Sequence, residues 1–147
     1  MNIRFEPVTK GNYRECIEMP KLEHVASNMF SIVQAYVLDR TYPFCIFNED
    51  KMIGFVMYKI IYDDEEDIDI FCMNRLYIAE EYQNKGYGRV AVNKLLQMIK
   101  EKHSSEEIYT STHHENHRAL HLYESIGFKR NGEMDDDEVV LVYRFRK

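Results

Sequence analysis

The sequence predicts a single α/β domain with a mixed β-sheet, and three observations lead to this fold class. The chain has 147 residues, the length of one ordinary domain. Hydrophobic residues make up 45% of it, which is enough for a core and too much for a disordered protein. The hydrophobic periodicity gives the order strand, two helices, three strands, helix, strand, helix and two strands, with no repeat and no linker. We therefore expect residues 1–147 to fold as one domain.

The N-terminal elements are a strand and two helices. Residues 3–8 alternate between apolar and polar side chains, which predicts the strand. Thr9 is the expected cap of a short helix over residues 11–18, and Ser27 or Asn28 is the expected cap of the second helix. The second helix carries apolar residues close to helical spacing, namely Phe30, Val33, Val37 and Leu38. This spacing is typical of an amphipathic helix that packs its apolar side against a core.

The middle of the chain is rich in strands. Residues 42–47 and 51–62 predict a hairpin whose turn is Asn48-Glu49-Asp50. Residues 70–78 predict a long third strand, which follows an acidic run at residues 63–67. Such a run of like charges is typical of a solvated loop, and the alternative is a negative field that attracts cationic substrates.

Helices and strands alternate in the C-terminal half. The first helix begins at two glycines, Gly86 and Gly88, and buries Val92, Leu95, Leu96 and Ile99. A strand over residues 107–111 follows. Asn116 then caps a helix that ends at Gly127 and whose inner face is formed by Ala119, Leu122, Tyr123 and Ile126. The last two strands cover residues 128–132 and 139–145, and a second acidic run at residues 135–138 joins them.

Charge and composition exclude several classes of function. The formal net charge is −6, whereas a nucleic-acid-binding protein usually carries a basic face, so we expect no nucleic-acid partner. No stretch approaches the ~20 apolar residues of a membrane span, and the N-terminus lacks the features of a signal peptide. We therefore expect no membrane association and a cytoplasmic location. The cysteines Cys16, Cys45 and Cys72 are widely spaced, and we interpret them as small core residues.

The segment Gln83-Asn84-Lys85-Gly86-Tyr87-Gly88 is the strongest candidate site. It joins a predicted strand to a predicted helix, and the first backbone N–H groups of a helix have no intrahelical partner. The helix dipole adds partial positive charge there, and glycines let the amides approach a phosphate without a Cβ in the way. Lys85 and Arg89 add full positive charges. The junction therefore predicts an anion site.

The loop alone leaves the identity of the anion open. The GxxxxGK-Ser/Thr pattern of P-loop proteins and the GxGxxG pattern of dinucleotide-binding proteins are both missing from the sequence. Two glycines alone also fit a tight turn that ends in an ordinary helix cap.

Two blocks of residues narrow the choice. Leu76-Tyr77-Ile78 followed by Tyr82-Gln83-Asn84-Lys85-Gly86-Tyr87-Gly88 resembles the signature of the GNAT acetyltransferase family, in which a Gln/Arg-x-x-Gly-x-Gly/Ala loop binds acyl-CoA. A second family block is matched in the right order by Asn116, Ala119, Leu122-Tyr123-Glu124 and Gly127-Phe128. The resemblance implies a central, mostly antiparallel mixed sheet of six or seven strands. In that fold the fourth and fifth strands splay apart, and about four helices flank the sheet.

The resemblance also implies how acetyl-CoA, the expected co-substrate, would bind. In this family pantetheine pairs with the splayed fourth strand, which here ends at Leu76-Tyr77-Ile78. The loop that opens at Gln83 would hold the pyrophosphate through the backbone amides of Asn84, Lys85, Gly86, Tyr87, Gly88 and Arg89. Asn116 would bind the pantetheine arm by family analogy, and it can also serve as a helix cap.

Tyr123 matches the position of the family's usual general acid. Its phenol would protonate the departing CoA thiolate, and ordinary pKa values of about 8–9 for a thiol and about 10 for tyrosine place this transfer close to balance. The alternative is a core tyrosine, which is a serious one in a chain with 11 tyrosines. The reaction would be a direct attack of a neutral amine on the thioester in a ternary complex.

The group that accepts the amine's proton is not identified by the sequence. Some family members carry an acid on the fourth or fifth strand, where this chain has Asn74 and Ser111. Glu115, His113 and His114 are the remaining candidates. In an extended segment the two adjacent histidines would point to opposite faces, and no third ligand is evident, so we predict no metal site.

The expected acceptor is a small-molecule amine, in particular a polyamine or diamine such as spermidine or spermine. Residues 25–35, Tyr42-Pro43-Phe44 and residues 53–58 resemble bacterial spermine/spermidine and diamine acetyltransferases. The acidic runs fit a polycationic substrate. Two alternatives stay open, namely acetylation of a protein N-terminus or lysine, and a non-catalytic module that binds acyl-CoA. The family resemblance also implies a homodimer.

Overall fold

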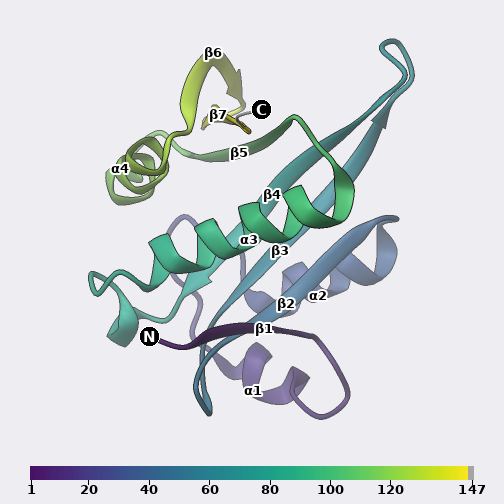
Figure 1. Ribbon diagram of the computed structural model, residues 1–147. Helices are drawn as coiled ribbons and strands as arrows, with labels where there is room; N and C mark the ends of the chain where they lie inside the picture. Colours follow the sequence, from purple (N-terminus) through teal and green to yellow (C-terminus); the bar gives the residue numbers. More distant parts are fainter. Residues whose placement is uncertain (146–147) are drawn as a thin grey trace.

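The computed structural model describes residues 1–145, which contain a seven-stranded sheet in the order β1-β2-β3-β4-β5-β7-β6 (Figure 1). β4 and β5 pair in parallel, and the other neighbouring strands pair antiparallel. This arrangement confirms the mixed, mostly antiparallel sheet that the sequence implied. The strands are β1 (Ile3–Pro7), β2 (Thr41–Asn48), β3 (Lys51–Asp63), β4 (Ile68–Ile78), β5 (Glu107–His113), β6 (Lys129–Asp135) and β7 (Glu138–Arg144).

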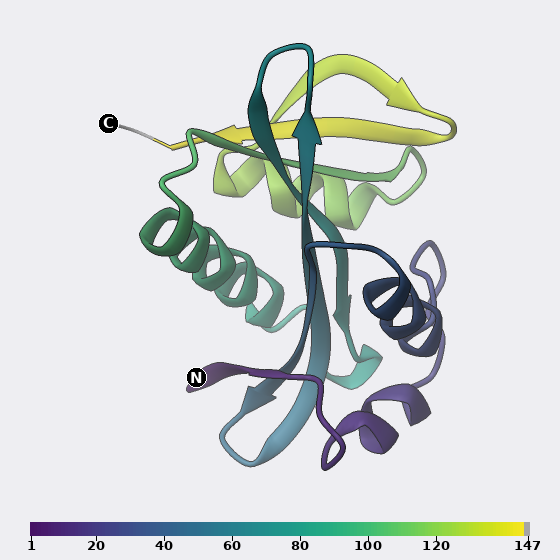
Figure 2. The same cartoon turned by 90° about the vertical axis from the view of Figure 1, so that its right-hand side faces the viewer.

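Four α-helices cover the two faces of the sheet, with α1 and α2 on one face and α3 and α4 on the other (Figure 2). A hydrophobic cluster lies on each side. The larger one includes Leu95 and Leu141, and the smaller one includes Cys45 and Phe55. Within the described residues, no helix is both long and apolar enough to cross a membrane. The helices are α1 (Tyr13–Glu18), α2 (Asn28–Val37), α3 (Tyr87–His103) and α4 (His117–Ile126), with a short 3-10 helix, η1 (Glu80–Tyr82).

The helix caps agree with the sequence except at α1. Ser27, Asn116 and Gly127 occupy the predicted cap positions. The prediction for Thr9 was wrong, because the N-cap of α1 is Asn12. The side-chain oxygen of Asn12 accepts a hydrogen bond from the Thr9 N–H (2.8 Å), so this pair fixes the loop before the helix and not the helix end itself.

The apolar stripe of α2 faces solvent, which corrects the amphipathic interpretation. Its members Phe30, Val33, Val37 and Leu38 are all exposed, and Val37 is 70% exposed. The packed side of α2 holds the buried polar residues Asn28 and Ser31 beside the apolar residues Ile32 and Ala35, which pack against the smaller cluster. Asn28 donates to the Cys16 carbonyl (3.0 Å), and Ser31 accepts from the Arg75 guanidinium (3.2 Å). These bonds tie the packed side of the helix to α1 and β4.

Two further details differ from the sequence interpretation. Cys16 and Cys45 are buried as predicted, whereas Cys72 is only partly buried. The second acidic run is not simply a loop, because Asp135 is the last residue of β6 and Glu138 is the first residue of β7. This places both side chains on a regular hairpin. The predicted homodimer stays a prediction.

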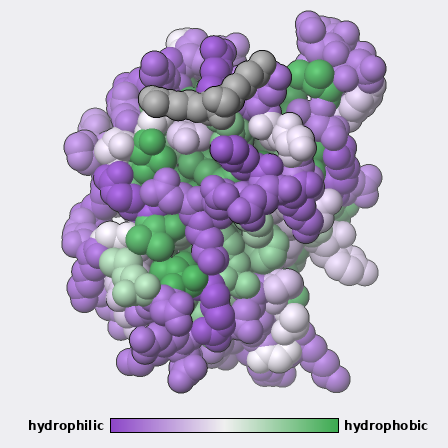
Figure 3. All heavy atoms as spheres, in the orientation of Figure 1, coloured by the Kyte–Doolittle hydropathy of each residue, from purple (hydrophilic) through white to green (hydrophobic). Residues whose placement is uncertain are grey.

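The β3–β4 hairpin extends beyond the other strands (Figures 1 and 2). Its tip holds the first acidic run, and residues 64–67 of that run are exposed, as expected for a solvated loop. Near the tip Ile61 and Ile68 are also exposed. Figure 3 shows hydrophobic atoms among hydrophilic ones at this projecting part, and further hydrophobic atoms toward the middle of the same face.

Gly54 in β3 lies against the backbone of β4. A Cβ at this position would lie 2.2 Å from the Tyr77 carbonyl oxygen, so a side chain must push the two strands apart. We therefore expect Gly54→Ala to lower the free energy of unfolding by about 1–3 kcal/mol, measured by urea denaturation. Gly11→Ala is the control, because the nearest atom to its Cβ would be 3.8 Å away, and we expect a change within ~0.5 kcal/mol. Equal midpoints for the two variants would contradict this close approach.

Candidate active site

β4 and β5 diverge near the centre of the sheet. The last residue pair between them is Met73 and Thr110, although β4 continues to Ile78. At this point the Thr110 hydroxyl donates to the Met73 carbonyl (2.9 Å), so a side chain bridges the strands where the ladder stops. Beyond it, no strand of the described residues pairs with this edge of β4. The backbone polar groups of that edge can therefore bind an extended ligand.

A cleft of about 1740 Å³ follows the divergence. It reaches from the loop before α3, past the start of α4, to the β6–β7 hairpin. The structure gathers most of the residues that the sequence assigned to the site on the walls of this cleft. They are Leu76, Ile78, Gln83, Asn84, Gly86, Gly88, Arg89, Asn116 and Tyr123.

Tyr77, Lys85 and Tyr87 are not among the residues that line the cleft. Tyr77 is buried, and its hydroxyl donates to the Pro20 carbonyl (2.5 Å). The Tyr87 hydroxyl accepts from the Asn48 side-chain amide (3.2 Å). The two tyrosine side chains thus support the end of β4 and the start of α3.

The loop before α3 has the geometry of an anion site. Asn84 and Gly86 both adopt a left-handed backbone, with φ of 63° and 90°. Gly86 is the N-cap of α3 and makes no side-chain cap, so the first amides of the helix are left to other acceptors. Gln83 fixes the loop, because its amide donates to the Ile78 carbonyl (2.9 Å) and accepts from Arg118. These features fit a pyrophosphate.

Tyr123 lies on the buried side of α4. Its ring packs against Phe128 with centroids 5.5 Å apart, and the residue is 5% exposed. Burial raises the pKa of the Tyr123 phenol, the Thr110 hydroxyl acts in the opposite direction, and the charge of Glu138 raises the pKa further. The phenol therefore stays neutral at pH 7 and keeps a proton that it can donate.

Asn116 has two separate capacities. Its side-chain oxygen accepts from the Ala119 N–H (3.2 Å) and so caps α4. The NH₂ group of the same amide remains a donor, and the residue lines the cleft. Capping and ligand binding are therefore compatible at this residue.

Carboxylates form the wall of the cleft that lies on the β6–β7 hairpin. They are Glu133, Asp135 and Glu138. Glu138 accepts a hydrogen bond from the Ser111 hydroxyl of β5 (2.6 Å). The sequence analysis missed Glu138 as a site residue. Its only signal there was the acidic run, and the run does not reveal that β7 pairs with β5.

Arg75 places a positive charge in the same cleft. Its guanidinium donates to the Gln34 side chain (2.6 Å), which ties β4 to α2, and to the Asn74 carbonyl (2.6 Å) within β4. Burial lowers the pKa of Arg75, and the carboxylate of Glu138 acts in the opposite direction. The cleft thus holds opposite charges on β4 and on the C-terminal hairpin.

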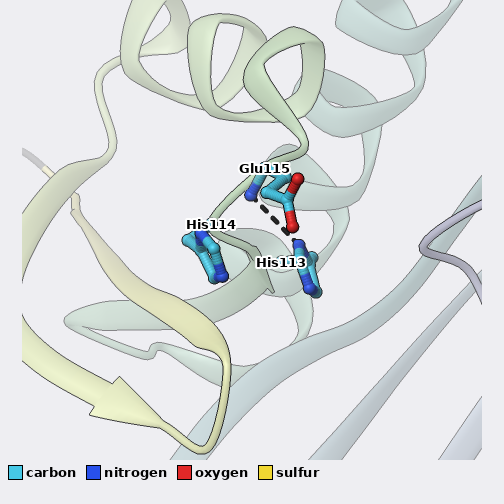
Figure 4. A group of neighbouring side chains, drawn as sticks. All are labelled: His113, His114 and Glu115. Carbon is cyan, nitrogen blue, oxygen red and sulfur yellow. Dashed lines mark hydrogen bonds between the residues drawn. The ribbon is translucent and has the colours of Figure 1, made fainter.

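His113, His114 and Glu115 cluster at the end of β5, with possible ligand atoms within 4.8 Å of one another (Figure 4). The two imidazoles stack with centroids 4.5 Å apart, so the prediction that they point to opposite faces was wrong. The reason is that β5 ends at His113 and the chain turns there. His113 Nδ1 accepts from the Glu115 N–H (3.0 Å), and Nε2 lies 3.2 Å from an Asp137 carboxylate oxygen. A metal ion would have to displace one of these partners, so we assign no metal site.

Of the three residues that the sequence offers as proton acceptor, the structure places one in the cleft. Glu115 lines the cleft, whereas His113 and His114 are not among its lining residues. The His113 ring stacks on His24 at 4.5 Å, and His24 does line the cleft. His113 therefore supports His24 at the wall of the cleft, and His114 stacks on His113 outside the lining.

The model of the GNAT acetyltransferase family matches residues 12–128. The chain belongs to this family. A curated relative, the spermine/spermidine N(1)-acetyltransferase of Bacillus subtilis strain 168, is 29% identical over 153 aligned residues, which cover 97% of this chain and 98% of the relative. The protein is therefore an acetyl-CoA-dependent N-acetyltransferase, with acetyl-CoA as co-substrate and an amine as acceptor.

Solved structures show the same fold for this acetyltransferase. The PaiA N-acetyltransferase of Thermoplasma acidophilum in complex with coenzyme A is 18% identical, with a TM-score of 0.74 and coverage of 99% of this chain and 100% of that one. An aminoglycoside acetyltransferase in complex with coenzyme A is 19% identical, with a TM-score of 0.78 and coverage of 97% and 95%. At these identities the likeness shows the fold alone.

Proposed function

We propose that this acetyltransferase transfers the acetyl group to a primary amine of a polyamine or diamine such as spermidine or spermine. The observation that carries the proposal is one continuous cleft, which joins the anion loop, the open edge of β4, Tyr123 and a wall of carboxylates. A polyamine carries several ammonium groups, and each one that enters a cleft needs an anionic or polar partner. Glu133, Asp135 and Glu138 offer such partners. The name of the Bacillus subtilis relative points to the same acceptor class.

The co-substrate occupies the other half of the cleft in this proposal. The backbone amides from Asn84 to Arg89 bind the pyrophosphate at the start of α3, where the helix dipole favours an anion. Pantetheine lies along the open edge of β4 between Leu76 and Ile78 and bonds to its backbone. The NH₂ group of Asn116 donates to the same arm. Acetyl-CoA supplies the activated acyl group, and the protein orients it.

Tyr123 is the general acid in this proposal. It lies at the divergence of β4 and β5, where the thioester end of the pantetheine arm has to be. The amine attacks the thioester carbon directly while both substrates are bound, so the main effect of the protein is to hold the two reactants in line. The phenol gives its proton to sulfur as the C–S bond breaks.

The acceptor class is tested by thiol release from acetyl-CoA with a panel of amines. We expect turnover with spermidine, spermine and a diamine, and little with a free amino acid or a lysine peptide. An alkyl monoamine of matched length is the control, because it keeps the reacting group and lacks the second charge. We expect the monoamine to have a kcat/KM at least tenfold lower than that of the diamine. Turnover of the peptide alone would replace the proposal by protein acetylation, and acetyl-CoA binding without turnover of any amine would favour a non-catalytic module.

A further inference from the structure

Asn74, Ser111 and Glu138 present hydrogen-bond acceptors from three neighbouring strands, β4, β5 and β7. Met73 pairs with Thr110 at the last step of the parallel ladder, so Asn74 and Ser111 are the next residues on the two strands. Asn74 lies at a bulge of β4, because Met73 pairs with Tyr58, Arg75 pairs with Met57, and Asn74 between them has no partner in β3. Ser111 lies in a regular part of β5, so its side chain faces away from the side on which Thr110 is buried. All three acceptor residues line the cleft.

These side chains have acceptor capacity that the protein does not use fully. The Asn74 side-chain oxygen is buried and has no hydrogen-bond partner among the described residues. A buried acceptor without a partner is costly, which indicates that a donor from a ligand belongs there. The Ser111 hydroxyl spends its proton on Glu138, so its lone pairs remain. The Glu138 carboxylate accepts that bond through one of its two oxygens.

A primary ammonium group is the complement of this set, because it has three N–H donors and no acceptor. The carboxylate adds charge to one of the three bonds, which makes that bond the strongest. We propose that Asn74, Ser111 and Glu138 form the seat of the reacting nitrogen, and that Glu138 takes the proton which this nitrogen loses as the amide forms. The inference rests on the proposed reaction of an amine in this cleft, and it does not require that the amine be a polyamine.

Every proton in the proposed reaction has a donor and an acceptor among the amine, Tyr123, Glu138 and solvent. The seated ammonium first loses one proton to solvent and becomes a neutral amine. Its lone pair attacks the thioester carbon, the C–N bond forms, and the C–S bond breaks as Tyr123 protonates sulfur. The nitrogen is now far more acidic and gives its second proton to Glu138, which releases it to solvent while the Tyr123 phenolate takes a proton from solvent. Ammonium and acetyl-CoA thus yield amide, CoA thiol and one released proton.

Glu138 lines the cleft, and its charge raises the pKa of the Tyr123 phenol, so the carboxylate and the proposed general acid interact electrostatically. Ser111, on the strand between β4 and β7, is already bonded to Glu138 (2.6 Å) and keeps its carboxylate oriented toward the cleft. At this place in the cleft β4 and β5 carry only Asn74 and Ser111, neither of which is an acid. Glu138 of β7 supplies the carboxylate that the two strands lack.

The decisive variant is Glu138→Gln, which keeps the size of the side chain and removes its charge and basicity. We expect kcat to fall by about 100-fold or more with the best acceptor, since general base catalysis contributes roughly 10²–10⁴-fold. Acetyl-CoA affinity by calorimetry and the thermal unfolding midpoint should not change. Glu101→Gln is the matched control, because Glu101 is exposed on α3 and is not a lining residue of the cleft. Activity of Glu138→Gln within threefold of wild type would overturn the inference.

Two further variants separate a chemical role from a structural one. Glu138→Asp keeps the charge with a shorter reach, and we expect it to recover part of the kcat that Glu138→Gln loses. Asn74→Ala should raise the acceptor KM at least tenfold while leaving acetyl-CoA affinity intact. An equal loss of kcat in Glu138→Asp and Glu138→Gln would contradict the role of Glu138 as a base. An unchanged acceptor KM in Asn74→Ala would contradict binding of the reacting nitrogen by Asn74.

The comparison uses whichever amine the wild-type enzyme turns over best, so the two proposals fail in different ways. If only a peptide is acetylated, the polyamine assignment fails, and Glu138→Gln still tests the seat with that peptide. If polyamines are acetylated equally by wild type and Glu138→Gln, the acceptor assignment stands and the role of Glu138 falls.

Discussion

Tyr123→Phe should lower kcat by about 100-fold or more while acetyl-CoA still binds with wild-type affinity. The variant removes only the hydroxyl and keeps the ring that packs against Phe128. General acid catalysis contributes roughly 10²–10⁴-fold, so the loss of the phenol proton should appear in the turnover of the bound complex. Thiol release gives kcat, and calorimetry gives the affinity for acetyl-CoA.

Tyr143→Phe is the matched control for this experiment. Tyr143 packs against the same Phe128 with ring centroids 5.4 Å apart, and it is not among the residues that line the cleft. We expect its activity to stay within about twofold of wild type, as is usual for substitutions away from a site. An unchanged rate for Tyr123→Phe would remove Tyr123 from the mechanism and leave it as a core residue.

The pH dependence of kcat/KM should follow the acceptor and not Tyr123. Burial raises the pKa of the Tyr123 phenol above its ordinary value of about 10, so the phenol keeps its proton throughout the neutral and mildly alkaline range. An alkyl ammonium has a pKa near that of lysine, about 10.4, so the neutral amine increases tenfold per pH unit below it. We expect the rate to rise from pH 7 to pH 9, and a fall over this range in wild type would contradict a neutral acid at Tyr123.

Gly86→Glu should abolish detectable acetyl-CoA binding while the fold is retained. Gly86 is the N-cap of α3, where the first amides of the helix have no intrahelical acceptor. Glutamate adds a side chain and a negative charge at the position proposed for the pyrophosphate, so steric and electrostatic effects act in the same direction. Calorimetry with acetyl-CoA measures the loss, and circular dichroism confirms the helix and strand content.

Backbone strain is the competing explanation, because Gly86 has φ of 90° and other residues adopt this conformation with difficulty. Gly132→Glu is the matched control. Gly132 has a similar φ of 85°, a Cβ added to it would meet no atom within 4 Å, and it is not a lining residue of the cleft. It should retain full affinity for acetyl-CoA. Wild-type affinity in Gly86→Glu would remove the loop from the cofactor site.

Local patterns gave correct predictions where neighbours in sequence are also neighbours in space. The glycine turn that begins α3, the N-cap at Asn116 and the left-handed Gly127 are of this kind, because each depends on a few consecutive residues. The placement of Tyr123 on a buried helix face follows from helical spacing in the same way. The family resemblance then connected these local features to an acetyl-CoA-dependent N-acetyltransferase.

The α2 stripe shows where a pattern fails. Periodicity correctly indicated a helix with one apolar side, but it does not indicate which side meets the sheet. The bonds of Asn28 and Ser31 decide that orientation, and one partner, Arg75, lies 44 positions away from Ser31 in the sequence. A partly buried guanidinium needs hydrogen-bond acceptors, and the packed side of α2 supplies them from Ser31 and Gln34.

The fold class, the glycine turn that begins α3 and the position of Tyr123 on a buried helix face could be predicted from the sequence, because these depend on local periodicity and on short motifs. The placement of Glu138 in the cleft beside Ser111 emerged from the three-dimensional arrangement. The pairing of β5 with β7 sets that position, and shifting a strand by one residue would turn its side chains to the opposite face. Strand register depends on contacts between distant segments, and the acidic run at residues 135–138 carries no local signal for it.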